Sequence, residues 1–284
     1  MKFIISIKVN FGDVLTGGVL VLHKLAYEIA RRGHKVTIFT KPEYPHPNII
    51  VEEDSSENEL NFEYNPNETV IIPSFDWKNN SNIKHVSRWA LYHIGPELMS
   101  NVDPTDEIFN FGSFEIYGVN STKKLTTFDY QKNIFINKKQ KREKRYCHLL
   151  LKNNPSNAHE LISYFDSFDL SDYKSKGCFE YLSEKFNEYE YFLTFDDKTF
   201  LTLAAAMCGC KPIILNTSVK RPLMYRMENP LQMFGVAYGF RDLTWCDNTL
   251  DYVPEYVDYL EMRDNETIDE FINFWKKKLK NEIL

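Results

Sequence analysis

The sequence lacks the cysteine and hydrophobic patterns of zinc-binding, secreted and membrane-spanning proteins. Its five cysteines show no paired metal spacing, because Cys208 and Cys210 are separated by one residue and no second pair follows. No run of about 18 apolar residues is present, so we expect no transmembrane helix. The N-terminal segment reaches Gly12 and Asp13 too early for a signal peptide. These absences, with an odd number of cysteines, indicate reduced thiols and a cytoplasmic protein.

The common catalytic and nucleotide signatures are also missing. The chain has no Walker loop, no Ser–His–Asp elbow and no Asp-x-Asp metal motif, since Asp196 and Asp197 are adjacent. Residues 12–18 do not form Gly-x-Gly-x-x-Gly, and no obvious acid follows the second expected strand, which disfavours a nicotinamide enzyme. We therefore expect neither a bound cofactor nor an obligatory divalent metal. The net charge of −6 disfavours nucleic acid as a partner.

The sequence does contain the composition and alternation of an α/β protein. Hydrophobic residues make up 43% and charged residues 26%, which suffices for a packed core. Residues 2–9 and 35–40 read as buried strands, and residues 19–32 have apolar side chains at helical spacing, with Gly33 after them. Such a strand–helix–strand unit implies two parallel strands joined by a right-handed crossover.

Shorter or weaker patterns predict the remaining elements. In the first half we expect a strand at 69–73, a strand or short helix at 86–93, and short elements at 107–111 and 125–130. In the second half we expect strands at 146–151, 191–194 and 212–216, and helices at 158–165, 177–187 and 199–208. A capping box at Thr267 and Glu270 and one apolar face predict a last helix over residues 266–284.

A basic run marks the expected domain boundary. Six of the eight residues at 138–145 are Lys or Arg. We predict an N-terminal domain over residues 1–137, a second domain over 146–265 and the helix over 266–284. The run is typical of a solvated linker. Its alternative role is attraction to an anionic membrane surface or a lipid phosphate, which would place the protein at the inner face of a membrane by peripheral contact.

The strongest local feature is a polar turn between an expected strand and an expected helix. Asp196, Asp197, Lys198 and Thr199 precede an alanine-rich helix that ends before Gly209. A helix N-terminus presents free backbone N–H groups and a positive dipole end, so it favours a diphosphate. Thr199 either caps the helix or donates its hydroxyl to phosphate, and Lys198 adds positive charge. From these residues alone, an ordinary capped turn is the simpler explanation.

Residues 191–215 (YFLTFDDKTFLTLAAAMCGCKPIIL) resemble the donor-binding segment of GT-B glycosyltransferases. They are especially similar to small bacterial and viral members, involved in surface glycans, with an Asp-Pro-x-Thr turn and Ala-Ala-x-Cys-Gly-Cys. The matching positions are Asp196, Thr199, Ala205, Cys208, Gly209 and Cys210. Asp197 stands where those members have proline. In the widespread Glu-x7-Glu version, Asp196 takes the place of the first Glu and Ala204 that of the second, which is expected to bind the ribose hydroxyls.

Three further stretches agree with the resemblance. Residues 25–37 are similar to the first helix–turn–strand of many GT-B enzymes, Gly17 and Gly18 match their glycine-rich loop, and residues 229–239 resemble the same small glycosyltransferases. The resemblance implies two Rossmann-like domains with parallel sheets that face a cleft, the acceptor mainly on the first and the donor mainly on the second. It also implies that the C-terminal helix packs back toward the N-terminal domain.

Candidate site residues follow from the same resemblance. The expected donor-binding residues are Asp196, Lys198, Thr199, Lys152, Gly17 and Gly18. Lys152 follows the expected strand 146–151, where the family places basic residues, and a surface lysine is the equally simple alternative. Asp13, in the loop after the first strand, and His93, before Gly95, are the candidate catalytic bases. For Asp13, capping a turn is the simpler role.

The sequence therefore predicts a glycosyltransferase. It would move a sugar from a UDP- or GDP-linked donor to a glycan or lipid-linked acceptor without a metal. The first alternative is a non-catalytic module with the same fold, which binds glycans or a partner enzyme. Ala204 in place of the ribose-binding Glu motivates this alternative. A nicotinamide enzyme on a Rossmann fold is the second alternative.

Overall fold

The chain forms two compact α/β units in a computed structural model that describes residues 1–7, 17–52, 64–79, 83–112, 114–120, 123–150, 154–215 and 222–283. Unit 1 comprises Met1–Asp129 and Glu261–Leu284, and unit 2 comprises Tyr130–Leu260. Unit 2 thus begins ahead of the basic run at 138–145. All strand pairs in the described residues are parallel, which confirms the expected mixed α/β class with parallel sheets.

The first sheet of unit 1 has four strands in the order β3-β2-β1-β4. They are β1 (Lys2–Ile5), β2 (Lys35–Ile38), β3 (Ile49–Val51) and β4 (Thr69–Ile72). Helix α1 (Gly17–Arg31) lies between β1 and β2 in the chain, and these strands pair in parallel with Phe3 opposite Val36. The predicted parallel strand–helix–strand unit is confirmed.

Unit 1 contains a second sheet, whose strands are also parallel. It contains β5 (Ser87–Ala90), β6 (Glu107–Asn110) and β7 (Lys123–Lys124), with the short helix α2 (Pro96–Met99) after β5. A parallel bridge between Ile71 and Val86 links the two sheets, and the Ile71 N–H donates to the His85 carbonyl at 3.0 Å. Of the two alternatives left open for residues 86–93, the strand is correct.

Residues 125–130 differ from the prediction, because they form neither a strand nor a helix. The Leu125 N–H still donates to the Asn110 carbonyl at the end of β6, but two of the following backbone donors bond to side chains of the C-terminal helix. The Thr126 N–H donates to Thr267 Oγ1 at 3.0 Å, and the Phe128 N–H donates to Asp264 Oδ2 at 3.0 Å. Buried backbone groups require partners, and helix side chains supply these two without a strand ladder.

The C-terminal helix α8 (Val253–Ile283) starts well before residue 266. The capping-box prediction is therefore wrong: Thr267 lies inside the helix, with its hydroxyl 3.0 Å from the carbonyl oxygens of Asp264 and Thr126. A Thr followed three residues later by Glu also occurs within helices, where the hydroxyl can bond to a carbonyl one turn back. Pro254 lies in the first turn, where proline is tolerated.

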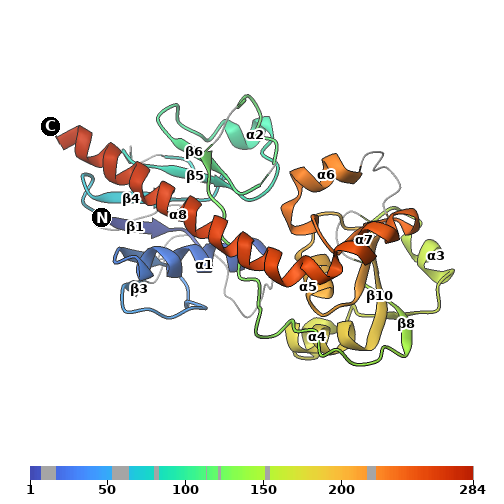
Figure 1. Cartoon of the computed structure of the whole chain (residues 1–284). Coiled ribbons are helices and arrows are strands. Elements are labelled where there is room, and N and C mark those ends of the chain that lie inside the picture. Colours follow the sequence, from blue (N-terminus) through green and yellow to red (C-terminus); the bar gives the residue numbers. More distant parts are fainter. Residues whose placement is uncertain are drawn as a thin grey trace. The chain divides into compact units, whose positions relative to one another are not determined.

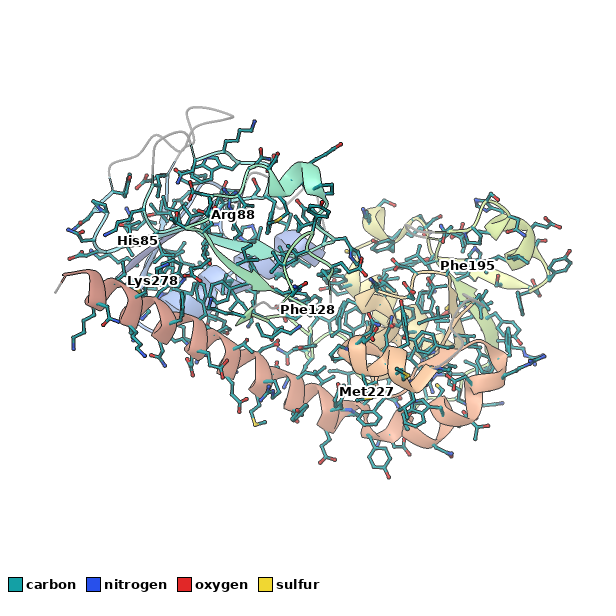
Figure 2. All side chains as sticks on the ribbon, turned by 90° about the horizontal axis from the view of Figure 1, so that it is seen from above. His85, Arg88, Phe128, Phe195, Met227 and Lys278 are labelled. Carbon is teal, nitrogen blue, oxygen red and sulfur yellow. The ribbon has the colours of Figure 1, made fainter. Side chains whose placement is uncertain are left out.

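Within unit 1, α8 passes over β1 and β4 in the view of Figure 1, and its aromatic side chains pack on both sheets. The Phe271 ring centroid lies 5.7 Å from that of Phe3 on β1 and 4.8 Å from that of Phe109 on β6. Lys278, labelled in Figure 2, bonds to Glu107 at 2.7 Å. The apolar face predicted for the end of the chain therefore belongs to the core of unit 1.

Unit 2 is built on a five-stranded sheet in the order β12-β11-β10-β8-β9. Its strands are β8 (Lys144–His148), β9 (Ser167–Asp169), β10 (Tyr189–Thr194), β11 (Lys211–Ile214) and β12 (Ala237–Tyr238). Its helices of six or more residues, besides the start of α8, are α3 (Ala158–Ser163), α4 (Phe179–Glu188), α5 (Phe200–Met207), α6 (Pro222–Glu228) and α7 (Leu243–Thr249). The helices predicted at 158–165, 177–187 and 199–208 are confirmed.

Helices cover both faces of this sheet. Leu193 on β10 packs in one core with Ala158 and Ile162 of α3. The next residue back, Phe192, points to the other layer, where its ring lies 5.0 Å from that of Phe186 on α4. Burial on both faces explains why the C-terminal halves of the central strands, residues 192–194 of β10 and 212–214 of β11, are buried and largely apolar.

The strand order of unit 2 reverses direction beside β8. From β8 the chain adds β9 on one side and then returns to add β10 on the other side. This is the flavodoxin-like order of a doubly wound sheet, in which ligands bind outside the carboxyl ends of the strands at the reversal. The fold thus points to the carboxyl ends of β8 and β10 as the place for a ligand.

Candidate functional site

The turn at residues 195–199 lies at the carboxyl end of β10, beside the strand-order reversal. The Asp196 N–H donates to Thr194 Oγ1 at 3.2 Å, and Asp196 Oδ1 accepts from the Lys198 N–H at 3.0 Å. Thr199 has an extended backbone, and its Oγ1 accepts from the Leu201 N–H at 3.2 Å, so it is the N-cap of α5. The structure thus brings Asp196, Lys198 and Thr199 together in one turn, with Thr199 as the cap.

Helix α5 behind this turn is almost wholly buried. Phe195, labelled in Figure 2, is 4% exposed and anchors the turn in the core of unit 2. Ala204 is fully buried, so its side chain points into the interior. The position at which the resemblance expects a ribose-binding Glu therefore lies inside the fold. A carboxylate there would need a buried partner.

The two cysteines that flank Gly209 are buried at the end of α5. Burial raises the pKa of Cys208 to about 12, and burial also raises the pKa of Cys210 well above its usual value. Thiols that stay protonated at neutral pH are poor nucleophiles and poor metal ligands. This part of the resembled motif therefore contributes packing, with Gly209 in the left-handed conformation at φ +79°.

A chain of buried hydrogen bonds supports the cap from the other side. Thr202 Oγ1 donates to the Thr199 carbonyl at 2.9 Å, and Gln232 Nε2 donates to Thr202 Oγ1 at 3.4 Å. The Tyr238 hydroxyl in turn donates to Gln232 Oε1 at 2.6 Å. Because these side chains are buried, the chain links the end of β12 to the start of α5 with little freedom.

Helix α6 contributes a second link to the turn. The Tyr225 hydroxyl donates to Asp197 Oδ2. Burial, and then the bond to Asp197, raise the pKa of Tyr225, so the tyrosine remains a protonated donor. The buried Arg226 of the same helix pairs with Asp242 and donates to the Val236 carbonyl at 3.0 Å. These contacts hold α6 next to the turn and place a donor on one of its two carboxylates.

On the β8 side of the reversal the structure places His148, the last residue of the strand. Its Nδ1 lies 2.9 Å from Ser167 Oγ, and its Nε2 lies 3.8 Å from Asp169 Oδ1. Burial lowers the pKa of His148, which favours the neutral ring at physiological pH. Lys152, the predicted basic residue after this strand, lies outside the described residues.

The remaining predicted residues belong to unit 1. Asp13 lies outside the described residues. Gly17 and Gly18 begin α1, and a Cβ built on Gly18 would approach Leu91 Cδ1 only to 4.0 Å, so the described neighbours do not require glycine there. His93 follows β5 and is exposed. The structure leaves the roles predicted for these residues untested.

The hydrogen bonding of His93 affects its proposed role as a base. Its Nδ1 accepts from the Glu115 N–H at 3.1 Å, and its ring lies edge-on to Phe114. A neutral histidine whose Nδ1 accepts a hydrogen bond carries its proton on Nε2. Proton abstraction by His93 would therefore require the bond to Glu115 to break.

Four residues that the structure places beside the strand-order reversal or in the contacts behind the turn were not predicted from the sequence. They are His148, Tyr225, Gln232 and Tyr238. A histidine inside the apolar stretch YCHLLL is a signal that was available for His148. Gln232 and Tyr238 lie within residues 229–239, which stood out only by their resemblance, and Tyr225 lies just before that segment. The bonds from Tyr225 to Asp197, from Gln232 to Thr202 and from Tyr238 to Gln232 depend on the tertiary structure.

The described part of the chain contains neither a metal-ligating cluster nor a membrane-spanning helix. Among these residues, no three His, Cys, Asp or Glu side chains are placed to hold a metal ion together. No helix among them is both long and apolar enough to cross a bilayer.

Comparison with known proteins gives one kind of match. No protein-family model matches the sequence, and no curated protein matches it. Among solved structures, the chain is similar to an alpha-glucosyltransferase in complex with UDP, with a TM-score of 0.41 and 12% sequence identity. The similarity covers 99% of this chain and 99% of that chain.

Proposed function

We propose that this protein is a glycosyltransferase that moves a sugar from a UDP- or GDP-linked donor to a glycan or lipid-linked acceptor. One observation carries the proposal: the turn at 195–199, which resembles the donor segment of GT-B enzymes, lies at the strand-order reversal of a doubly wound sheet. That is where a sheet of this order binds its ligand. Sequence resemblance and topology therefore select the same turn independently.

The start of α5 suits the diphosphate of such a donor. Helix N-termini attract anions through unpaired N–H groups and the helix dipole. Thr199 Oγ1 uses one lone pair to accept from the Leu201 N–H, and its hydroxyl hydrogen is still available to a phosphate oxygen. Lys198 adds a positive charge in the same turn, and Lys152 adds another in our proposal. These groups would stabilise the charge that develops on the leaving nucleotide diphosphate.

The two carboxylates of the turn would otherwise repel a diphosphate. Asp196 accepts from the Lys198 N–H, and Asp197 accepts from the Tyr225 hydroxyl. Donors that bond to a carboxylate reduce its repulsion of a neighbouring anion, and the remaining lone pairs can accept from sugar hydroxyls. We therefore assign Asp196 and Asp197 to the sugar side of the donor and α5 to the diphosphate side.

The chemical step needs a base and, in our proposal, no metal. Asp13 and His93 are the proposed bases for the acceptor hydroxyl. The proposal assigns charge neutralisation to α5, Lys198 and Lys152 in place of a divalent ion. It therefore expects EDTA to leave transfer unchanged.

Calorimetric titration with UDP, GDP and their sugars tests the donor site. We expect one nucleotide family to bind, and Thr199→Ala and Lys198→Ala each to weaken that binding several-fold. Lys174→Ala, at an exposed position elsewhere in unit 2, is the control and should leave the affinity unchanged. If no nucleotide or nucleotide sugar binds to the wild type, or if all three variants bind like it, the proposal is wrong.

A second candidate function is a glycosyltransferase-like module without catalysis. The buried Ala204 favours it, since the ribose-binding Glu of the widespread donor segment has no counterpart at that position. Incubation of purified protein with the bound nucleotide sugar, with release of free nucleotide as the readout, separates the two. Donor hydrolysis or transfer above the buffer blank excludes the non-catalytic module, and binding without turnover supports it.

A further inference from the structure

A group of aromatic side chains in unit 2 lies outside the proposed donor site. It consists of Phe234, Trp245, Tyr252, Tyr256 and Tyr259, which we call the aromatic face. The Phe234 ring is central: its centroid lies 6.4 Å from Trp245 in a stacked arrangement, 6.4 Å from Tyr252 and 4.8 Å from Tyr256. Tyr256 stacks on Tyr259 at 5.9 Å. Residues from three separate segments thus form one continuous aromatic surface.

The backbone beneath this surface is closely packed. Gly235 has a φ of +70°, and a Cβ built on it would lie 2.6 Å from Val253 Cγ2. Its N–H donates to the buried Thr249 Oγ1 at 2.9 Å, and Trp245 Nε1 donates to the Met233 carbonyl at 3.0 Å. The close approach at Gly235 and these two bonds fix Phe234 and Trp245 in their orientations. The aromatic face is therefore preorganised, which reduces the entropy lost on binding.

The outer rings of the aromatic face are open to solvent. Tyr252 is 58% exposed and Tyr259 is 48% exposed, whereas Phe234, Trp245 and Tyr256 are half-buried. Single exposed aromatic residues are common, but a contiguous exposed aromatic surface marks an interaction site. Tyrosine and tryptophan give large rigid contact areas with a polar edge at low entropic cost.

The charges around the aromatic face limit what can bind there. Asp251 and Glu255 are exposed on the same stretch of chain as the tyrosines, and Asp258 is exposed and paired with Lys132 at 2.7 Å. Carboxylates at the rim repel nucleic acid and anionic lipid. They also disfavour a second copy of this chain docked through the same face, because like charges would meet across the two-fold axis.

We propose that the aromatic face binds a neutral glycan chain. Aromatic rings pack against the C–H faces of sugar rings, while the Asp251 and Glu255 carboxylates and the tyrosine hydroxyls bond to sugar hydroxyls. The proposal rests on the proposed function only for the expectation that the acceptor is a glycan. The aromatic face then holds part of the acceptor chain away from the reacting end and raises its local concentration.

Native gel electrophoresis in gels that contain dextran, laminarin or galactomannan tests the proposal. We expect at least one of these neutral polysaccharides to retard the full-length wild type. Tyr252→Ser combined with Tyr259→Ser should weaken the apparent affinity at least about tenfold, since exposed aromatic contacts carry much of the energy at such sites. Tyr164→Ser, at a 74% exposed tyrosine elsewhere in unit 2, is the control and should migrate like the wild type.

Several outcomes would overturn the proposal. The proposal is wrong if none of the three polysaccharides retards the wild type, or if the double variant is retarded as strongly as the wild type. It is also wrong if polylysine retards the wild type and the polysaccharides do not. UDP and GDP titrations of the double variant separate this proposal from the donor site, since its nucleotide affinity should equal that of the wild type. A wild type that binds polysaccharide but no nucleotide would contradict the transferase and support the glycan-binding face.

Discussion

The Tyr225 hydroxyl donates a hydrogen bond to Asp197 Oδ2 and so ties helix α6 to the turn that starts α5. The two residues are far apart in the chain, and neither has an obvious role in the sequence. The donated hydrogen bond offsets part of the negative charge of Asp197 beside the proposed diphosphate position. This contact explains how an Asp can stand where the resembled family has proline.

Tyr225→Phe removes only this donor and should weaken the binding of UDP or GDP about threefold to tenfold. The Asp197 carboxylate then repels the diphosphate without a compensating hydrogen bond. Calorimetric titration measures the change, with the exposed Tyr164→Phe as the matched control. Equal affinities for the two variants would show that Tyr225 has no part in donor binding.

Breaking the buried ion pair of unit 1 should cause a large loss of stability. The side chains of Arg88 and Asp106 are buried, and Arg88 Nε lies 2.8 Å from Asp106 Oδ2. Arg88, labelled in Figure 2, also donates to the carbonyls of Ser74 and Trp77. Asp106→Ala leaves the guanidinium without its counter-ion, at an expected cost of about 3–5 kcal/mol. Urea unfolding, followed by fluorescence, measures the free energy of unfolding of unit 1.

An exposed ion pair in the same unit supplies the control for that measurement. Arg263 and Glu266 lie 2.6 Å apart, and both side chains are about half exposed. Glu266→Ala should cost no more than about 1 kcal/mol, since water and salt screen such pairs. If Asp106→Ala costs as little as Glu266→Ala, the buried pair does not stabilise unit 1 in the way proposed.

Two glycines with positive φ should respond differently to substitution. The positive φ at Gly235 and at Gly177 would strain an L-residue at either position. A Cβ added to Gly235 would lie 2.6 Å from Val253 Cγ2, whereas a Cβ added to Gly177 would meet no atom within 4 Å. Gly235→Ala should therefore cost about 1–3 kcal/mol more than Gly177→Ala, because it overpacks a core. Thermal unfolding compares the two variants, and equal melting temperatures would contradict the steric argument.

Three histidines that are buried or partly buried predict a loss of stability in mild acid. Burial lowers the pKa of His23, His34 and His148 in the folded chain below the usual 6.5. Below about pH 6.5 the unfolded chain therefore binds more protons than the folded chain, and stability falls as the pH falls. Unfolding midpoints between pH 7.5 and 5.5 should decrease. His148→Gln should flatten part of this decrease, and a curve unaffected by pH over that range would contradict the prediction.

The sequence predicts several elements of the fold well. The parallel unit of β1, α1 and β2 and the segment from β10 to β11 have clear periodic patterns, because both strands and helices bury apolar side chains at regular spacing. The start of α8 and the state of residues 125–130 are predicted wrongly. The state of residues 125–130 depends on bonds from Thr126 and Phe128 to α8 side chains more than a hundred residues away.

The sequence by itself determined the α/β class, the polar turn and its cap, because these depend on neighbours a few residues apart. Only the tertiary structure decided which strands lie side by side, and hence that the turn at 195–199 meets the strand-order reversal. It also decided that Tyr225 reaches Asp197 and that Tyr238 supports Thr199 through Gln232. Such contacts follow from the packing of distant segments, and no local pattern encodes them.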